Sequence, residues 1–276
     1  MKKPDEVQIA SQTFGDPRDP ALLLIMGAMA SMLWWPEALC CKLAGEGRFV
    51  IRYDNRDTGL STKYALGAYT FDDMADDAVS VLDSYGIARA HVVGMSAGGM
   101  IAQLVALKHP SRVISLTVIS SSPVGIDTSH LPGTTAAYME HSAEGADVDW
   151  SNREQVVDFI VKDAHAIAST VHPFDETKTR AFVEQDYDRS GGFLSATNHF
   201  TLKGGEDWKG RLHEIKAPLL VIHGTSDPIF PVEHGAALVE AVPGGRLVRI
   251  EGGGHELHPQ DWATIVAAIT AHTQPS

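Results

Sequence analysis

The sequence predicts an α/β protein built on a mostly parallel sheet, with flanking helices and one helical insert. The first observation is a set of short apolar runs separated by segments of helical spacing; the runs are 21–27, 49–53, 91–95 and 113–120. Runs of this kind are typical of parallel strands that are covered on both faces. The second observation is their order, because strand and helix alternate as in a doubly wound sheet.

The remaining elements are assigned from spacing and from their ends. Residues 7–13 alternate weakly and predict an edge strand. The segment 71–85 has a helical apolar stripe, and Asp72 and Asp73 in its first turn favour the helix dipole. Glycine or proline ends most of the predicted helices. The other expected helices are 36–44, 98–109, 232–242 and 260–272, and the last two strands are 218–224 and 246–251.

The stretch 123–208 differs from its surroundings, because it has polar helical segments and no clear strand. We therefore expect a core domain of residues 1–122 and 209–276, with 123–208 inserted as a helical cap over the sheet. Some aromatic side chains of the cap should pack on the core, and the others should line an apolar substrate pocket. These aromatics are Phe159, Phe174, Phe182, Phe193 and Phe200.

Charge and composition exclude several classes of protein. The chain has 276 residues and a formal net charge of −13. This charge disfavours nucleic acid and anionic membranes as partners, because both attract clustered Lys and Arg. The N-terminal MKKPDEVQIA lacks the apolar segment of a secretory signal, and the stretch 21–30 is about half as long as a membrane helix. We expect a cytoplasmic protein.

A short motif, Gly94-Met95-Ser96-Ala97-Gly98, lies between a predicted strand and a predicted helix. In this context G-x-S-x-G indicates the nucleophile elbow of the α/β-hydrolase fold. The glycines are needed because the backbone segments before and after the serine nearly touch. The strained turn lifts the hydroxyl clear of the sheet and places N–H groups of the new helix beside it. Ser96 is therefore the expected nucleophile.

A serine hydroxyl needs a general base, and the base needs an acid that orients it. In this fold the three follow in the order Ser, Asp or Glu, His. Asp227 in HGTSDPIFP and His255 in EGGGHEL each follow a predicted strand. Both should therefore reach the carboxyl edge, where open α/β sheets place their sites. We expect His255 to be the base and Asp227 the acid.

Other residues compete for these roles. Asp127 follows the strand 113–120 and is the alternative acid. His223 ends a strand and is expected to be a buried, hydrogen-bonded histidine. His255 and His258 suggest a metal pair, but no carboxylate or cysteine cluster completes a site. We therefore expect no metal and no other cofactor.

An oxyanion hole requires backbone N–H donors beside the nucleophile. Ala97 supplies one donor, and Ala28, in the loop after the first apolar run, supplies the second. This loop reads Met26-Gly27-Ala28-Met29 and departs from the common His-Gly pattern of the fold. Because the donor is a backbone group, the loss of the histidine need not remove the hole.

Several segments together resemble the α/β-hydrolase superfamily, and within it the aclacinomycin methylesterase group. They are LLLIMGAMASMLWWPEALC, RYDNRDTGLST, HVVGMSAGGMIAQ, VIHGTSDPIFP and GGGHEL. The likeness covers the sheet-forming segments, and the group removes a methyl ester from an anthracycline polyketide. It implies ester hydrolysis. The cap, which selects the substrate, shows little likeness.

The expected reaction is hydrolysis of neutral, apolar, small-to-medium carboxylic esters through an acyl-enzyme. The alternatives with the same triad are perhydrolysis of the cofactor-free haloperoxidase type, lactone hydrolysis and C–C bond hydrolysis. A ligand-binding receptor on a hydrolase scaffold is the non-enzymatic alternative. Dehalogenases and ordinary epoxide hydrolases are disfavoured because they use an Asp where Ser96 stands.

Overall fold

A computed structural model of the chain describes residues 7–274, so most of the N-terminal segment considered above lies outside it. Its centre is a seven-stranded sheet in the order β1-β3-β2-β4-β5-β6-β7. The strands are β1 (Ser11–Phe14), β2 (Ala21–Ile25), β3 (Phe49–Tyr53), β4 (Ala90–Met95), β5 (Val113–Ile119), β6 (Leu219–Gly224) and β7 (Arg246–Ile250). Only the β1–β3 pair is antiparallel among these strands. The predicted fold class is confirmed.

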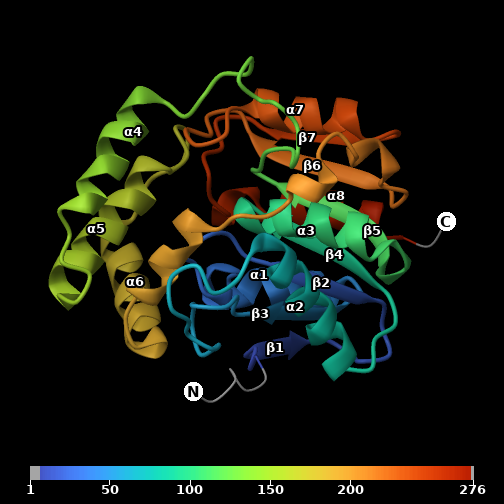
Figure 1. The fold of residues 1–276 in the computed structure, drawn as a ribbon, viewed down its shortest axis with the longest axis horizontal. Coiled ribbons are helices and arrows are strands. Elements are labelled where there is room, and N and C mark those ends of the chain that lie inside the picture. Colours follow the sequence, from blue (N-terminus) through green and yellow to red (C-terminus); the bar gives the residue numbers. More distant parts are fainter. Residues whose placement is uncertain (1–6, 275–276) are drawn as a thin grey trace.

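Helices cover both faces of this sheet (Figure 1). One face carries α2 (Phe71–Ser84), α3 (Ala97–Lys108) and α7 (Val232–Ala241), and the other carries α1 (Glu37–Gly45) and α8 (Trp262–His272). Strand β2 explains why both faces need cover. Leu23 and Ile25 enter one core, whereas Leu22 and Leu24 enter the other. A fully apolar strand is therefore stable only between two helical layers.

The segment between β5 and β6 contains helices and no strand. It comprises α4 (Ala136–Ala143), α5 (Arg153–Ala166), α6 (Glu176–Ser190) and a 3₁₀ helix, η4 (Ser195–Thr201). Local sequence sets the helix ends: the Asn152 and Asp175 side chains cap the N-termini of α5 and α6, and Gly191 ends α6 in the left-handed conformation. Helices α4 to α6 form a layer of their own beside the sheet (Figure 1).

This helical layer has a small apolar core. Its buried members are Val156, Val157, Val161, Val183 and Phe193. No helix within residues 7–274 combines the length and the apolar character that crossing a membrane requires.

Candidate active site

Ser96 lies at the junction of β4 and α3 in a strained conformation, with φ 55° and ψ −127°. A positive φ is uncommon outside glycine and indicates a constrained turn. A Cβ atom on Gly94 would lie 2.1 Å from the Gly98 carbonyl oxygen, and one on Gly98 would lie 2.3 Å from the Ile25 carbonyl oxygen. Glycine is therefore required on both sides of Ser96. For Gly94 the reason is the expected close approach of the two flanking segments, whereas Gly98 is required because the end of β2 lies against it.

Asp227 and His255 come together in the loops after β6 and β7. The His255 Nδ1–H group donates to Asp227 Oδ2 over 2.7 Å. The other carboxylate oxygen accepts the N–H groups of Ile229 and Phe230, each at 2.9 Å. Both side chains are buried, so the bond is shielded from water and fixes the imidazole ring.

Electrostatics keep Asp227 ionised. Burial alone would raise the pKa of Asp227, but the charge of His255 and hydrogen bonds from His223 and His255 outweigh it. The resulting pKa lies far below the ordinary value for a carboxyl group. A carboxylate that stays charged can stabilise an imidazolium during a reaction.

Asp127, the alternative acid, and His223 have other surroundings than the pair of Asp227 and His255. Asp127 is exposed, and its carboxylate accepts the N–H group of Ser129 at 2.9 Å. His223 is buried, as expected, and its Nε2 lies 2.7 Å from the Phe230 carbonyl oxygen and 3.5 Å from Asp227 Oδ2. Within residues 7–274, no hydrogen bond joins the Ser96 hydroxyl to His255. Such contacts are often long in a free enzyme.

Ala28 and Ala97 both line a small cavity of about 10 Å³. Gly27, Asn55 and His199 also line it, its apolar wall is formed by Met26, Phe71, Met74, Ile101 and Leu202, and Ser96 is not among its lining residues. This is about the space that one water-sized group needs. A Cβ atom on Gly27 would lie 2.9 Å from the Ser96 Cβ atom, so the loop after β2 approaches the elbow closely. In the described part of the chain, neither alanine N–H group has a hydrogen-bond acceptor.

A much larger cavity, of about 1120 Å³, reaches the same region. Met95, which precedes Ser96, and His255 both line it. Its apolar wall otherwise includes Met26, Leu33, Trp34, Ile167, Phe174, Phe182, Leu257 and Trp262. Its acidic residues are Glu37, Asp175, Glu176 and Glu256, and its cations are Arg52 and Lys178. Both cations already have partners within the protein, in Gln12 and Asp175 respectively.

The five phenylalanines of the insert have different surroundings. Phe174 and Phe182 line the large cavity. Phe193 is buried in the core of the insert, and Phe159 stacks on His141. Phe200 is 70% exposed. The expectation that these aromatics pack on the sheet domain or line the pocket is therefore wrong for Phe200, and also for Phe159 and Phe193, which pack within the insert.

The insert also touches the loop that carries His255. The His255 N–H group donates to the Ile167 carbonyl oxygen at 2.8 Å, and the Ser169 N–H group donates to Glu256 Oε1 at 2.7 Å. A Cβ atom on Gly254 would lie 2.2 Å from the Ile167 carbonyl oxygen. The glycine in front of His255 therefore makes room for the insert.

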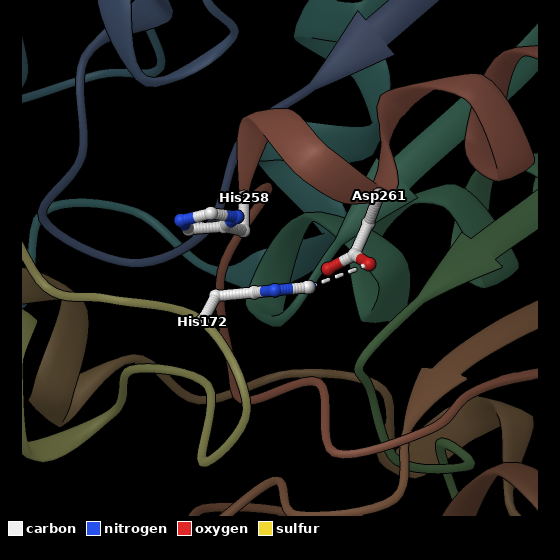
Figure 2. Close-up of side chains that lie close together, drawn as sticks. All are labelled: His172, His258 and Asp261. Atoms are coloured by element: carbon white, nitrogen blue, oxygen red, sulfur yellow. Dashed lines mark hydrogen bonds and ion pairs between the residues drawn. The ribbon is translucent and has the colours of Figure 1, made fainter.

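Near this loop, one group of side chains has the composition of a metal site. Figure 2 shows His172, His258 and Asp261, whose potential ligand atoms lie within 4.8 Å of one another. The expectation that no carboxylate lies beside His255 and His258 is therefore corrected for His258, which has Asp261 close by; His255 is not part of this group. His172 Nε2 lies 2.9 Å from Asp261 Oδ1. The imidazole rings of His172 and His258 stack, with their centroids 4.3 Å apart and an angle of 15° between their planes. Stacked rings direct their in-plane lone pairs in parallel, so this geometry does not converge on one ion.

Sequence reasoning missed the polar residues that support the site. The segment DNRDTGLS receives no site role from the sequence, yet its Asp54, Asn55 and Asp57 are all buried. Asp54 pairs with Arg189 of α6 at 2.7 Å, and Asn55 Nδ2 donates to the Met26 carbonyl oxygen at 2.9 Å. The density of polar residues directly after a buried strand is the feature that could have identified them.

The chain belongs to the alpha/beta hydrolase fold family, whose model matches residues 20–261. It is 35% identical to rhodomycin D methylesterase DauP of Streptomyces sp. (strain C5) and 34% identical to rhodomycin D methylesterase DnrP of Streptomyces peucetius. Each comparison covers 98% of this chain and 96% of the relative. The resemblance to methylesterases inferred from the sequence is confirmed, and these relatives support a carboxylic ester hydrolase.

Solved structures are similar over almost the whole chain. The esterase EaEST from Exiguobacterium antarcticum aligns with a TM-score of 0.79 at 22% identity, covering 98% of this chain and 96% of that one. The esterase RhEst1 from Rhodococcus sp. ECU1013 also aligns with a TM-score of 0.79, at 21% identity, covering 97% of this chain and 94% of that one. At this level of identity, both show the fold alone.

Proposed function

We propose that the chain is a serine carboxylic ester hydrolase with Ser96 as nucleophile, His255 as general base and Asp227 as the orienting acid. The observation that carries the proposal is the 2.7 Å hydrogen bond between the buried Asp227 and His255. It fixes the proton on His255 Nδ1 and leaves Nε2 free to accept a proton. The strained turn at Ser96 and the relatives' activity support the same assignment.

In the proposed mechanism, Ser96 Oγ attacks the ester carbonyl carbon while His255 accepts the hydroxyl proton. The N–H groups of Ala28 and Ala97 donate to the oxyanion. The tetrahedral intermediate then expels the alcohol, which takes the proton from His255. Water, deprotonated by His255, attacks the acyl-enzyme, and collapse of the second intermediate releases the acid and restores Ser96.

We propose neutral, apolar esters as substrates, and the size of the cavity extends this class to methyl esters of bulky acids. Ligand pockets are commonly about 300–1,000 Å³, so a cavity of about 1120 Å³ exceeds what a short ester needs. Acidic residues outnumber cations in its lining: Lys178 forms an ion pair with Asp175, and Arg52 is hydrogen-bonded to the neutral side chain of Gln12. Residues 123–208 would act as the cap, because Phe174 and Phe182 of this segment form part of the wall.

The test replaces the nucleophile. Ser96→Ala should abolish turnover of a 4-nitrophenyl ester and of a bulky methyl ester, while the circular dichroism spectrum stays unchanged. A phosphonylating reagent should label Ser96 in the wild-type protein, as located by peptide mass spectrometry. A folded Ser96→Ala protein that retains activity would exclude the assignment.

A further inference from the structure

A histidine of the insert contacts the loop that lacks the common His-Gly pattern. His199, in η4, is 5% exposed and lines the same small cavity as Ala28 and Ala97. Its Nδ1 accepts the N–H group of Met29 at 3.0 Å, and its Nε2 lies 2.7 Å from the Arg56 carbonyl oxygen. One ring therefore joins the residue after Ala28 to the loop after β3.

The partners of His199 determine its tautomer. A backbone N–H group can only donate, so Nδ1 must be the acceptor; a carbonyl oxygen can only accept, so Nε2 must carry the proton. Burial lowers the pKa of His199, which keeps the ring neutral at neutral pH. A neutral acceptor suits this position, because a carboxylate there would repel a developing oxyanion.

The loop needs such an anchor because its conformation is strained. Met29 has a φ of 62°, a left-handed conformation that costs free energy for a residue other than glycine. The neighbouring anchors hold other atoms: Asn55 holds the Met26 carbonyl oxygen, and Asp54 holds the Met32 N–H group at 2.8 Å. The contact to His199 is the one that fixes the N–H group directly after Ala28.

We propose that His199 is a positioning residue for the oxyanion hole: it holds the strained Met29 turn so that the Ala28 N–H group stays in place beside Ser96, which the neighbouring Gly27 closely approaches. The inference rests on the proposed function, because it takes Ala28 as an oxyanion donor. Its consequence is that the insert, besides lining the substrate cavity, completes the catalytic machinery. Misplacing a donor should affect the transition state more than the bound ester.

Two substitutions separate the two nitrogen atoms of the ring. His199→Asn places an amide oxygen near the position of Nδ1 and keeps an acceptor for Met29. His199→Gln places its amide near Nε2 and leaves the Met29 N–H group without an acceptor. His91→Gln is the matched control, since His91 is a buried histidine bonded to Ser115 Oγ at 2.8 Å near the amino-terminal end of β4. Steady-state kinetics on a 4-nitrophenyl ester and the affinity of a boronic acid, which mimics the tetrahedral intermediate, are measured for each.

His199→Gln should lower kcat by about 10- to 100-fold with little change in KM, and should weaken boronic acid binding by a similar factor. His199→Asn should stay within a few-fold of the wild type, as should His91→Gln. A purely structural role would instead lower the melting temperature of both His199 variants, without a selective loss of kcat in His199→Gln. If His199→Gln does not fold, His199→Asn still decides: retained kcat supports the Met29 contact and lost kcat overturns it.

Wild-type kcat in a folded His199→Gln enzyme would overturn this inference and leave the proposed function intact. Absence of ester turnover in the wild-type protein, or turnover that survives Ser96→Ala, would overturn both.

Discussion

Replacing the acid of the proposed triad gives a sharp test, because Asp227 has two separable tasks. One oxygen accepts the His255 Nδ1–H group, and the other holds the Ile229 and Phe230 N–H groups. In Asp227→Asn the amide oxygen can keep the two backbone contacts. The amide NH₂ group then faces His255 Nδ1, which forces the ring proton onto Nε2. The loop is preserved while the base is put in the wrong tautomer.

The size of the effect follows from the charges. Two unit charges 2.7 Å apart interact by about 6 kcal/mol at an effective dielectric constant of about 20. Each 1.36 kcal/mol of lost transition-state stabilisation costs about tenfold in rate. Delocalised charge reduces the interaction, so we expect kcat to fall by roughly 10³–10⁴, the size of loss known for the corresponding change in serine proteases.

The assay is steady-state turnover of a 4-nitrophenyl ester, with circular dichroism to confirm folding. Asp127→Asn is the matched control, since Asp127 is exposed and contacts Ser129; its kcat should equal that of the wild type. A mild effect of Asp227→Asn together with a severe effect of Asp127→Asn would show that the acid follows β5 and not β6.

The remaining predictions concern packing, charge and pH. Gly254→Ala should lower the melting temperature and kcat, because its Cβ atom would lie 2.2 Å from a carbonyl oxygen of the insert; Gly45→Ala, with no such atom within 4 Å, should be tolerated. In urea unfolding, Arg189→Leu should reduce the free energy of unfolding by about 3–5 kcal/mol, since it leaves the buried Asp54 without its charged partner. The folded-state pKa of Asp227 is depressed, so its stabilisation is complete above the unfolded pKa of about 3.9 and is lost as pH falls toward the folded pKa. The wild-type melting temperature should thus fall more steeply below about pH 5 than that of Asp227→Asn. A neutral diester should be hydrolysed faster than its dicarboxylate half-ester, and the opposite order in a kcat/KM comparison would show that a cation of the cavity, such as Arg52, binds the substrate carboxylate.

The sheet could be predicted because its elements are encoded locally. The run 49–53 is apolar enough to be a strand by itself, and β3 has those bounds in the structure. Helix α2 was marked by its apolar stripe and by acidic residues, and the structure adds a capping box between Thr70 and Asp73. Chain order and the ends of the last two strands were sufficient to propose the pair of Asp227 and His255, which the structure brings within 2.7 Å.

The sequence by itself therefore determined the strands of the sheet, the helices that flank it, the elbow at Ser96 and the order of the proposed triad. These depend on periodicity, on glycine sterics and on the rule that parallel strands end at one edge. Only the tertiary structure decided which side chains meet across that edge. His199 beside Met29, Arg189 beside Asp54 and His172 beside Asp261 join the insert to loops far away in the chain. No local pattern encodes such pairs, because they form only when distant segments pack together and buried polar groups must find partners there.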